Sequence, residues 1–229
     1  MFMEKRKRGR PPGPTARGEA TRERLYEAAI TAFDARGYEA TTLRHIAKVA
    51  GVSPGLLYRY FPSKSAVVVE LYDRLSKSFT TFEGPQGPLA TRFAATLRAS
   101  LAVLAPHRDV LRSMLGVLLA DPEVGLLSPH TEASRSRVRE RFEVAVAQAT
   151  DVPASVAEPL GRLAYWVQMG VILWWLLDRS AHTEATTTLI EWLSRGLAWL
   201  PSVRWVPGFA EGIRHLDALA TQGLLGGGR

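Results

Sequence analysis

The chain has 229 residues, an apolar content of 46% and a net charge of +7, and it contains no cysteine. The missing cysteines exclude a disulfide framework and thiolate chemistry, and they fit a cytoplasmic protein. No apolar stretch follows the charged first residues, so no secretory signal is expected. Residues 1–64 hold 13 of the 29 basic and six of the 22 acidic side chains, so the whole net charge lies there. A cationic end on a neutral remainder is typical of a module that binds phosphates.

The first twenty residues are basic and poor in apolar side chains, so we expect residues 1–20 to form a flexible arm. Within it, Arg8-Gly9-Arg10-Pro11 resembles the core of an AT-hook, in which Arg-Gly-Arg lies in a narrow A·T-rich minor groove. Arg8 and Arg10 are therefore candidate DNA contacts. A solvated basic tail that adds salt-sensitive, nonspecific affinity explains the same residues equally well.

Two helices are expected after the arm. Apolar side chains at helical spacing predict the first over residues 21–36, and Gly37 ends it. The second begins after Thr42, whose side chain is suited to cap the free amides of a helix N-terminus. Gly51 follows this helix, because the turn there needs a positive φ.

A third helix is predicted after Ser53, its expected N-cap, with Pro54 at the first position, where proline is tolerated. Pro62 ends this helix, and a fourth is expected from Lys64 to about Phe79. The second and third helices together form a helix-turn-helix, which places its second helix in the major groove of DNA.

The exposed side of the third helix indicates how DNA would be read. Arg59 matches a guanine, Leu56 matches a thymine methyl group, and Gly55 lets the backbone approach closely. Phosphates would be held by the helix N-terminus near Thr42 and by the side chains of Tyr60 and Lys64. The full set of candidate contacts in this region is Thr42, Arg44, Ser53, Pro54, Gly55, Leu56, Tyr58, Arg59, Tyr60 and Lys64.

Beyond a cluster of helix breakers at 83–88, the pattern is helical to the end of the chain, and no segment alternates with period two. Pro159 lies within one predicted helix, so that helix is kinked there or begins later. The most apolar run, 163–177, has 15 residues, fewer than the roughly 20 of a membrane span, so we expect a buried helix and no membrane contact. The predicted helices cover 89–105, 107–120, 129–149, 154–178, 183–200 and 208–221.

Residues 21–71 resemble the DNA-binding domain of the tetracycline-repressor (TetR) family. The resemblance implies an all-α fold with an N-terminal three-helix helix-turn-helix domain and a larger C-terminal helical domain. We therefore expect an arm over 1–20, a DNA-binding domain over 21–68, and a ligand-binding and dimerisation domain over 69–229. Many members have a small polar residue at the position of Leu56, so no operator sequence is carried over. The matching segments are 33–38, 40–43, 46–47, 50–53, Gly55 and 57–64.

The family architecture also implies a homodimer formed by the helices near 154–178 and 183–200, packed as a four-helix bundle. One stripe of the first helix is predicted to meet the two-fold mate, and three apolar residues of the second helix give it a matching face. These residues are Leu163, Val167, Gly170, Trp174 and Leu177 in the first helix, and Trp192, Leu193 and Leu197 in the second.

A small-molecule effector is implied as well, and the aromatic and methionine content suits an apolar or planar compound with a polar anchor. An ordinary core with one satisfied glutamine explains the same residues, and Gln168 alternatively sets the register of the dimer. An outer helix over 207–223 has no assigned role. The candidate effector contacts are Arg112, Met114, Leu118, Trp166, Gln168, Met169 and Leu173, with Arg98 as a further one.

These features favour a dimeric repressor that binds double-stranded DNA at a palindromic operator and is released by a small apolar or aromatic ligand. Activation in place of repression stays open, and a ligand-independent architectural or nucleoid protein is the alternative. Residues 51–55 match the G-x-S-x-G pattern of serine hydrolases, but that motif needs a strand before its turn. We therefore expect no enzyme activity, no cofactor and no metal site.

Overall fold

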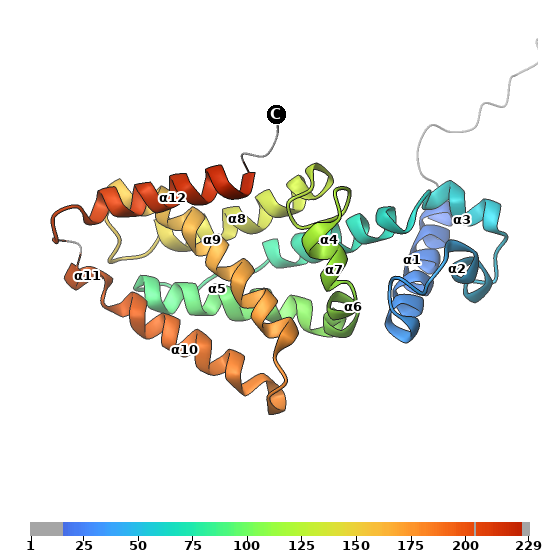
Figure 1. Ribbon diagram of the computed structural model, residues 1–229, viewed down its shortest axis with the longest axis horizontal. Coiled ribbons are helices and arrows are strands. Elements are labelled where there is room, and N and C mark those ends of the chain that lie inside the picture. The colour runs from blue at the N-terminus through green and yellow to red at the C-terminus, as the bar shows by residue number, and fades with distance from the viewer. Residues whose placement is uncertain (1–15, 204, 226–229) are drawn as a thin grey trace, which may run out of the picture. The chain divides into compact units, whose positions relative to one another are not determined.

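A computed structural model describes residues 16–203 and 205–225 (Figure 1). Arg8 and Arg10, the candidate minor-groove residues, lie outside this range. Within it every regular element is a helix, which confirms the all-α prediction. In chain order the α-helices are α1 (Ala16–Arg36), α2 (Leu43–Val49), α3 (Pro54–Tyr60), α4 (Lys64–Thr80), α5 (Leu89–Leu104), α6 (Arg108–Ser113), α7 (Leu115–Ala120), α8 (Glu132–Ala147), α9 (Ala154–Leu177), α10 (Glu184–Ala198), α11 (Leu200–Val203) and α12 (Phe209–Leu225). Short 3-10 turns, η1 (Ala105–His107), η2 (Pro129–Thr131) and η3 (Ala181–Thr183), precede α6, α8 and α10.

The chain divides into two compact units, residues 1–64 and 65–229. In the first unit α2 packs on both α1 and α3. Its core consists of apolar side chains contributed by all three helices and by the residues just after α1 and α3, and burying them is what holds such short helices together. The largest fully buried side chains among them are Leu25, Phe33, Ile46, Leu57 and Phe61.

Helix α1 begins at Ala16, five residues before the predicted start, so residues 16–20 belong to a helix and not to the arm. The sequence here has no apolar stripe for the first turn to bury. It does have Ala16, Arg17, Glu19 and Ala20, which favour helix by intrinsic propensity. The hydroxyl of Thr21 also donates to the carbonyl of Arg17 at 2.8 Å, one turn earlier.

In the second unit α9 packs on α8 and α12, α5 packs on α8, and α10 packs on α5 (Figure 1). Pro159 lies inside α9 without ending it, so the helix does not begin later than predicted. The predicted helix 107–120 is instead two helices, because Met114 (φ −102°, ψ 6°) leaves helical geometry between α6 and α7.

Helix α9 has 24 residues, and within the described chain it is the one helix long and apolar enough to cross a membrane. The apolar run 163–177 is part of this longer helix, which begins well before Leu163. Of its most apolar window, 44% is buried inside the protein. One such helix is weak evidence for a span, because a buried core helix has the same length and composition.

The segment between α4 and α5, which contains the helix breakers at 83–88, is held in place by Arg92. This guanidinium is 2% exposed, and its Nε donates to the carbonyl of Ala145 at 2.8 Å. Its Nη2 donates to Gln148 Oε1 at 2.7 Å, and its Nη1 donates to the carbonyl of Pro85. Buried charge is tolerated where such hydrogen bonds replace water, so Arg92 fixes this segment against α5 and α8.

Asp178 joins the end of α9 to the start of α10. Its carboxylate accepts hydrogen bonds from the hydroxyl and amide of Ser180 at 2.6 and 2.8 Å. It also accepts from the hydroxyl and amide of Thr186 at 2.6 and 2.9 Å. Because all four donors favour the ionised form, the pKa of Asp178 lies well below its ordinary value. The same connection holds Thr183 at a left-handed φ of 57°, which is costly for a β-branched residue.

Candidate functional site

The first candidate site is the helix-turn-helix formed by α2, the turn at Gly51 and α3. Thr42 Oγ1 accepts from the amide of His45 at 3.1 Å, and Ser53 Oγ accepts from the amide of Leu56 at 3.3 Å. Both predicted N-caps are thus confirmed. Gly51 has a φ of +65°, as the turn was expected to require. Because this turn joins two helices, the hydrolase motif at 51–55 has no preceding strand and Ser53 acts as a cap.

Helix α3 is anchored by one side and exposed on the other. Leu57 is fully buried, whereas Pro54, Gly55, Tyr58 and Arg59 are exposed. Leu56 and Tyr60 are partly buried at the edge of this face. No acidic residue occurs in the helix, so nothing on it repels phosphate. The structure therefore brings the predicted base-reading residues to one surface, and their contacts with DNA remain predictions.

Some of the predicted phosphate contacts are exposed, whereas one of them already forms hydrogen bonds within the protein. Thr42 and Arg44 are exposed. Lys64 Nζ instead donates to the carbonyl of Tyr38 at 2.8 Å and to that of Glu39 at 3.4 Å. It also lies 4.3 Å from the centre of the Tyr38 ring. Since an ammonium has three donors, one stays available to a phosphate, but Lys64 has a structural role that the sequence did not indicate.

The second candidate site is an apolar cavity of about 120 Å³ inside the second unit. Side chains of α4, α5, α6, α7, α8 and α9 line it, together with residues of the segment before α8. Of the predicted effector contacts, Leu118, Gln168, Met169 and Leu173 line this cavity.

The remaining predicted effector contacts lie elsewhere. Arg112 and Arg98 are exposed at the surface, and Met114 is fully buried away from the cavity. Trp166 lines a different hollow beside α12, next to the ion pair of Arg162 and Asp217 at 2.6 Å. Asp217 and Glu158 raise the pKa of Arg162 above its ordinary value, and the ion pair with Asp217 holds α12 against α9.

Two polar groups on α9 face the cavity with incomplete hydrogen bonding. Gln168 is 2% exposed, and its Nε2 donates to Ser100 Oγ at 2.9 Å, but its Oε1 has no partner. The expected core glutamine is therefore only half satisfied. The hydroxyl of Tyr165, also 2% exposed, has no partner either. Burial raises the pKa of Tyr165 to about 12, so the hydroxyl keeps its proton at neutral pH.

Sequence reasoning missed Tyr165, because a tyrosine in an apolar helix carries no signal of which way its hydroxyl points. The same holds for the polar wall that Thr131 and Arg135 contribute to the cavity. Arg135 Nη1 donates to the carbonyls of Leu126 and Ser128, both at 2.8 Å. Its Nη2 forms an ion pair with Glu132, so the charge of this guanidinium is already neutralised.

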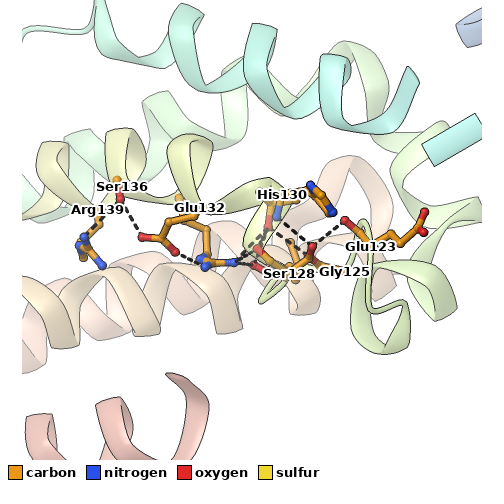
Figure 2. A network of polar contacts seen from close by, with 10 residues as sticks. Glu123, Gly125, Ser128, His130, Glu132, Ser136 and Arg139 are labelled. Carbon is orange, nitrogen blue, oxygen red and sulfur yellow. Dashed lines mark hydrogen bonds and ion pairs between the residues drawn. The ribbon is translucent and has the colours of Figure 1, made fainter. Parts of the chain in front are cut away.

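A polar network fixes the backbone of this wall (Figure 2). Ser128 Oγ donates to the carbonyl of Glu123 at 2.6 Å and accepts from the amide of His130 at 3.1 Å. Farther along α8, Ser136 Oγ donates to Glu132 Oε1 at 2.9 Å, as Figure 2 shows. The polar groups of this wall are thus hydrogen-bonded, whereas Gln168 Oε1 and the Tyr165 hydroxyl on α9 are not.

The predicted dimer helices carry an uncovered apolar face. Trp174 is 51% exposed and Leu177 is 60% exposed on α9, and Trp192 is 69% exposed on α10. A Cβ atom added to Gly170 would have no neighbouring atom within 4 Å, so that part of α9 is open to close approach. An apolar hollow of about 270 Å³ lies between these helices, lined in part by Leu163, Val167, Trp192, Leu193 and Leu197.

The described residues contain no group of three or more histidine, cysteine, aspartate or glutamate side chains that could hold a metal ion. The chemistry present is thus that of binding: a basic helix-turn-helix, an apolar cavity and an apolar face.

Comparisons with known proteins agree with this reading. Residues 25–71 match the family model for bacterial regulatory proteins of the tetR family. The HTH-type transcriptional repressor KstR2 of Mycolicibacterium smegmatis is 33% identical over 96 residues, which cover 38% of this chain and 47% of that protein. The nucleoid occlusion factor SlmA of Haemophilus ducreyi is 43% identical over 47 residues, 20% of this chain and 23% of that protein. The chain spans about half the length of the first of these relatives.

The likeness extends further in structure. A crystal structure of a tetR-family transcriptional regulator from Streptomyces coelicolor superposes with a TM-score of 0.59 at 25% identity. The superposition covers 87% of this chain and 89% of that one, and so includes the C-terminal helices. KstR2 and the Streptomyces coelicolor protein are described as transcriptional regulators, which agrees with the expectation of no enzyme activity. Residues 25–71 thus form a DNA-binding module of the TetR family of bacterial regulatory proteins, and the fold of the chain is similar to that of a tetR-family regulator.

Proposed function

We propose that the protein is a dimeric transcriptional repressor that binds a palindromic operator and leaves it when a small, largely apolar molecule occupies the cavity of the second unit. The observation that carries this proposal is the helix-turn-helix, with its anchored inner side and its exposed, acid-free outer side on α3. The similarity of 38% of the chain to the repressor KstR2 supports the direction of regulation.

On the operator, α3 would lie in the major groove. Arg59 is the candidate reader of a guanine, and Leu56 is the candidate partner of a thymine methyl group. Tyr60, Arg44 and the amide end of α2 near Thr42 would hold the backbone and fix the register. This division predicts that Arg59 determines sequence preference and that the others determine general affinity.

The exposed apolar face of α9 and α10 supports a homodimer. An exposed patch with several large aromatic side chains marks an interaction surface more often than free surface. The face contains two glycines, Gly170 and Gly196, at which a Cβ atom would have no neighbour within 4 Å, so the helices of a partner could approach closely there. A dimer would present two α3 helices to half-sites roughly 34 Å apart along the duplex.

Helix α4 supports a response to a ligand. It begins at Lys64, the last residue of the first unit, and its side chains Tyr72, Leu75, Ser76 and Phe79 line the cavity. A ligand that binds better to one position of α4 than to another would shift the population of DNA-binding conformations by that difference in affinity. A cytoplasmic location belongs to the same proposal.

The alternative is an architectural DNA-binding protein without a ligand. The similarity to the nucleoid occlusion factor SlmA favours it, but that match is confined to 47 residues, 20% of this chain. The cavity with its unsatisfied polar groups has no role under this alternative.

Capture of fragmented genomic DNA on the purified protein, followed by sequencing, separates the two. A few sharp sites that share a palindrome would support the repressor. Broad recovery of A·T-rich DNA without a shared palindrome would refute it in favour of the architectural protein.

A further inference from the structure

The cavity of the second unit contains two buried polar atoms without partners, and together they define a chemical requirement. Gln168 Oε1 can only accept a hydrogen bond, whereas the Tyr165 hydroxyl can donate one as well as accept one. The two residues are three positions apart in α9, so their side chains share one face of the helix. Leaving such groups unpaired in an apolar interior is costly, and native proteins rarely do so without a reason.

A hydroxyl group satisfies this pair better than other polar groups do. It donates to Gln168 Oε1 and at the same time accepts from Tyr165. A carboxylate has no proton for Gln168, and an ammonium has no lone pair for Tyr165. If the amide of Gln168 is rotated so that Nε2 faces the cavity, a hydroxyl accepts from that group too.

The rest of the lining excludes a charged ligand. Among the described residues that line the cavity, the one cation is Arg135, which is paired with Glu132 and with backbone carbonyls. The same lining contains no carboxylate. A charged group entering the cavity would lose its hydration without gaining an opposite charge, at a large cost.

We propose that this cavity binds a small neutral molecule with an apolar body and one hydroxyl group, held by Gln168 Oε1 and the Tyr165 hydroxyl. The inference rests on the ligand response in the proposed function and specifies its chemistry. A volume of about 120 Å³ is close to the roughly 150 Å³ that encloses benzene in an apolar cavity. Phenol and short alcohols are therefore suitable probes.

The test compares phenol with toluene, which has a methyl group in place of the hydroxyl. A purely apolar cavity favours toluene, because the hydroxyl of phenol would leave water without a new partner. Isothermal titration calorimetry on the full chain without DNA gives the ratio of the two dissociation constants. We expect the wild type to bind phenol at least as tightly as toluene.

Two variants assign the effect to the proposed atoms. Gln168→Met keeps the length of the side chain and removes its polar atoms, so it should shift the ratio toward toluene by roughly tenfold or more. Tyr165→Phe should shift it in the same direction and serves alone if Gln168→Met does not fold. Leu119→Met changes an exposed side chain of α7 that does not line the cavity, and it should leave the ratio unchanged.

Three results would overturn the proposal. A wild type that prefers toluene as strongly as Gln168→Met does would show a cavity without hydroxyl recognition. If the ratio of the phenol and toluene dissociation constants were the same in the wild type, Gln168→Met and Tyr165→Phe, these two residues would not recognise the hydroxyl group. Absence of binding by phenol, toluene and 1-hexanol at millimolar concentration would mean that water or the core itself satisfies these atoms.

The regulator proposal is tested separately, by the genomic capture described above. If the cavity prefers phenol but the protein binds no operator, the ligand site is supported and the repressor proposal is refuted. If the protein binds an operator but the cavity does not distinguish phenol from toluene, the repressor proposal is supported and the ligand site is refuted.

Discussion

Replacing Gly161 by alanine tests a close approach between α8 and α9. A Cβ atom at this position would lie 2.8 Å from the Cα of Glu143 and 3.1 Å from its Cγ. The first of these atoms is backbone and cannot rotate away, so the two helices must shift relative to each other. Added atoms in a packed core typically cost about 1–3 kcal/mol.

The helix propensity of alanine works against this cost. Glycine inside a helix is about 1 kcal/mol less favourable than alanine. The net loss in the free energy of unfolding for Gly161→Ala is therefore expected at about 0–2 kcal/mol. Gly212→Ala is the matched control, because Gly212 is exposed in α12 and has no atom within 4 Å of its Cβ position. It should be as stable as the wild type or up to about 1 kcal/mol more stable.

Urea denaturation followed by far-ultraviolet circular dichroism measures the difference between the two variants, which we expect at about 1–3 kcal/mol. Both must be measured at one protein concentration, because a dimer gains stability with concentration. If Gly161→Ala is as stable as Gly212→Ala, the backbone of α8 does not limit the approach of α9, and the reasoning fails.

Four further outcomes are expected. Arg59→Gln should weaken operator binding by roughly 1–3 kcal/mol in fluorescence anisotropy while binding to unrelated DNA changes less; equal losses would make Arg59 a phosphate contact. Deletion of residues 2–14 should reduce affinity most at sites flanked by A·T runs, and an equal loss at G·C flanks would leave a plain basic tail. In analytical ultracentrifugation Trp192→Glu should be monomeric, whereas the wild type and the control Leu119→Glu should be dimeric. A dimeric Trp192→Glu would show that the dimer interface does not include this face of α10. Because the folded-state pKa of Asp178 is lowered, its ionised form stabilises the fold above the ordinary aspartate pKa of about 3.9. That contribution is lost as the pH falls toward the folded-state pKa. The difference in urea midpoint between the wild type and Asp178→Asn should therefore shrink below a pH of about 4. A difference that stays constant with pH would show that the charge of Asp178 is not its origin.

The helix-turn-helix could be predicted from the sequence because its signals are local. Ser53, Pro54 and Gly51 each impose a geometry on their own backbone, so the cap, the helix start and the turn follow from residue type alone. The break at Met114 carries no such signal, because methionine is a good helix former.

The residues that line the cavity were harder to predict, because side chains that meet there are far apart in the sequence. Gln168 meets Ser100, which is 68 residues away in the chain, and no periodicity within α9 shows which neighbour a buried side chain will find. Met114 and Leu118 are one turn apart, yet only Leu118 reaches the cavity. Apolar spacing predicts that a residue is buried, whereas the side of the core that it faces depends on the tertiary arrangement.

Helix α4, which starts beside the carbonyls of Tyr38 and Glu39 and lines the cavity farther along, has a thermodynamic consequence. If occupancy of the cavity lowers operator affinity by some factor, operator binding lowers cavity affinity by the same factor. An effector titrated against the operator complex should then show a weaker apparent affinity than against the free protein. The same molecule would first occupy the unbound pool of protein, so the concentration at which transcription begins depends on how much repressor the cell holds.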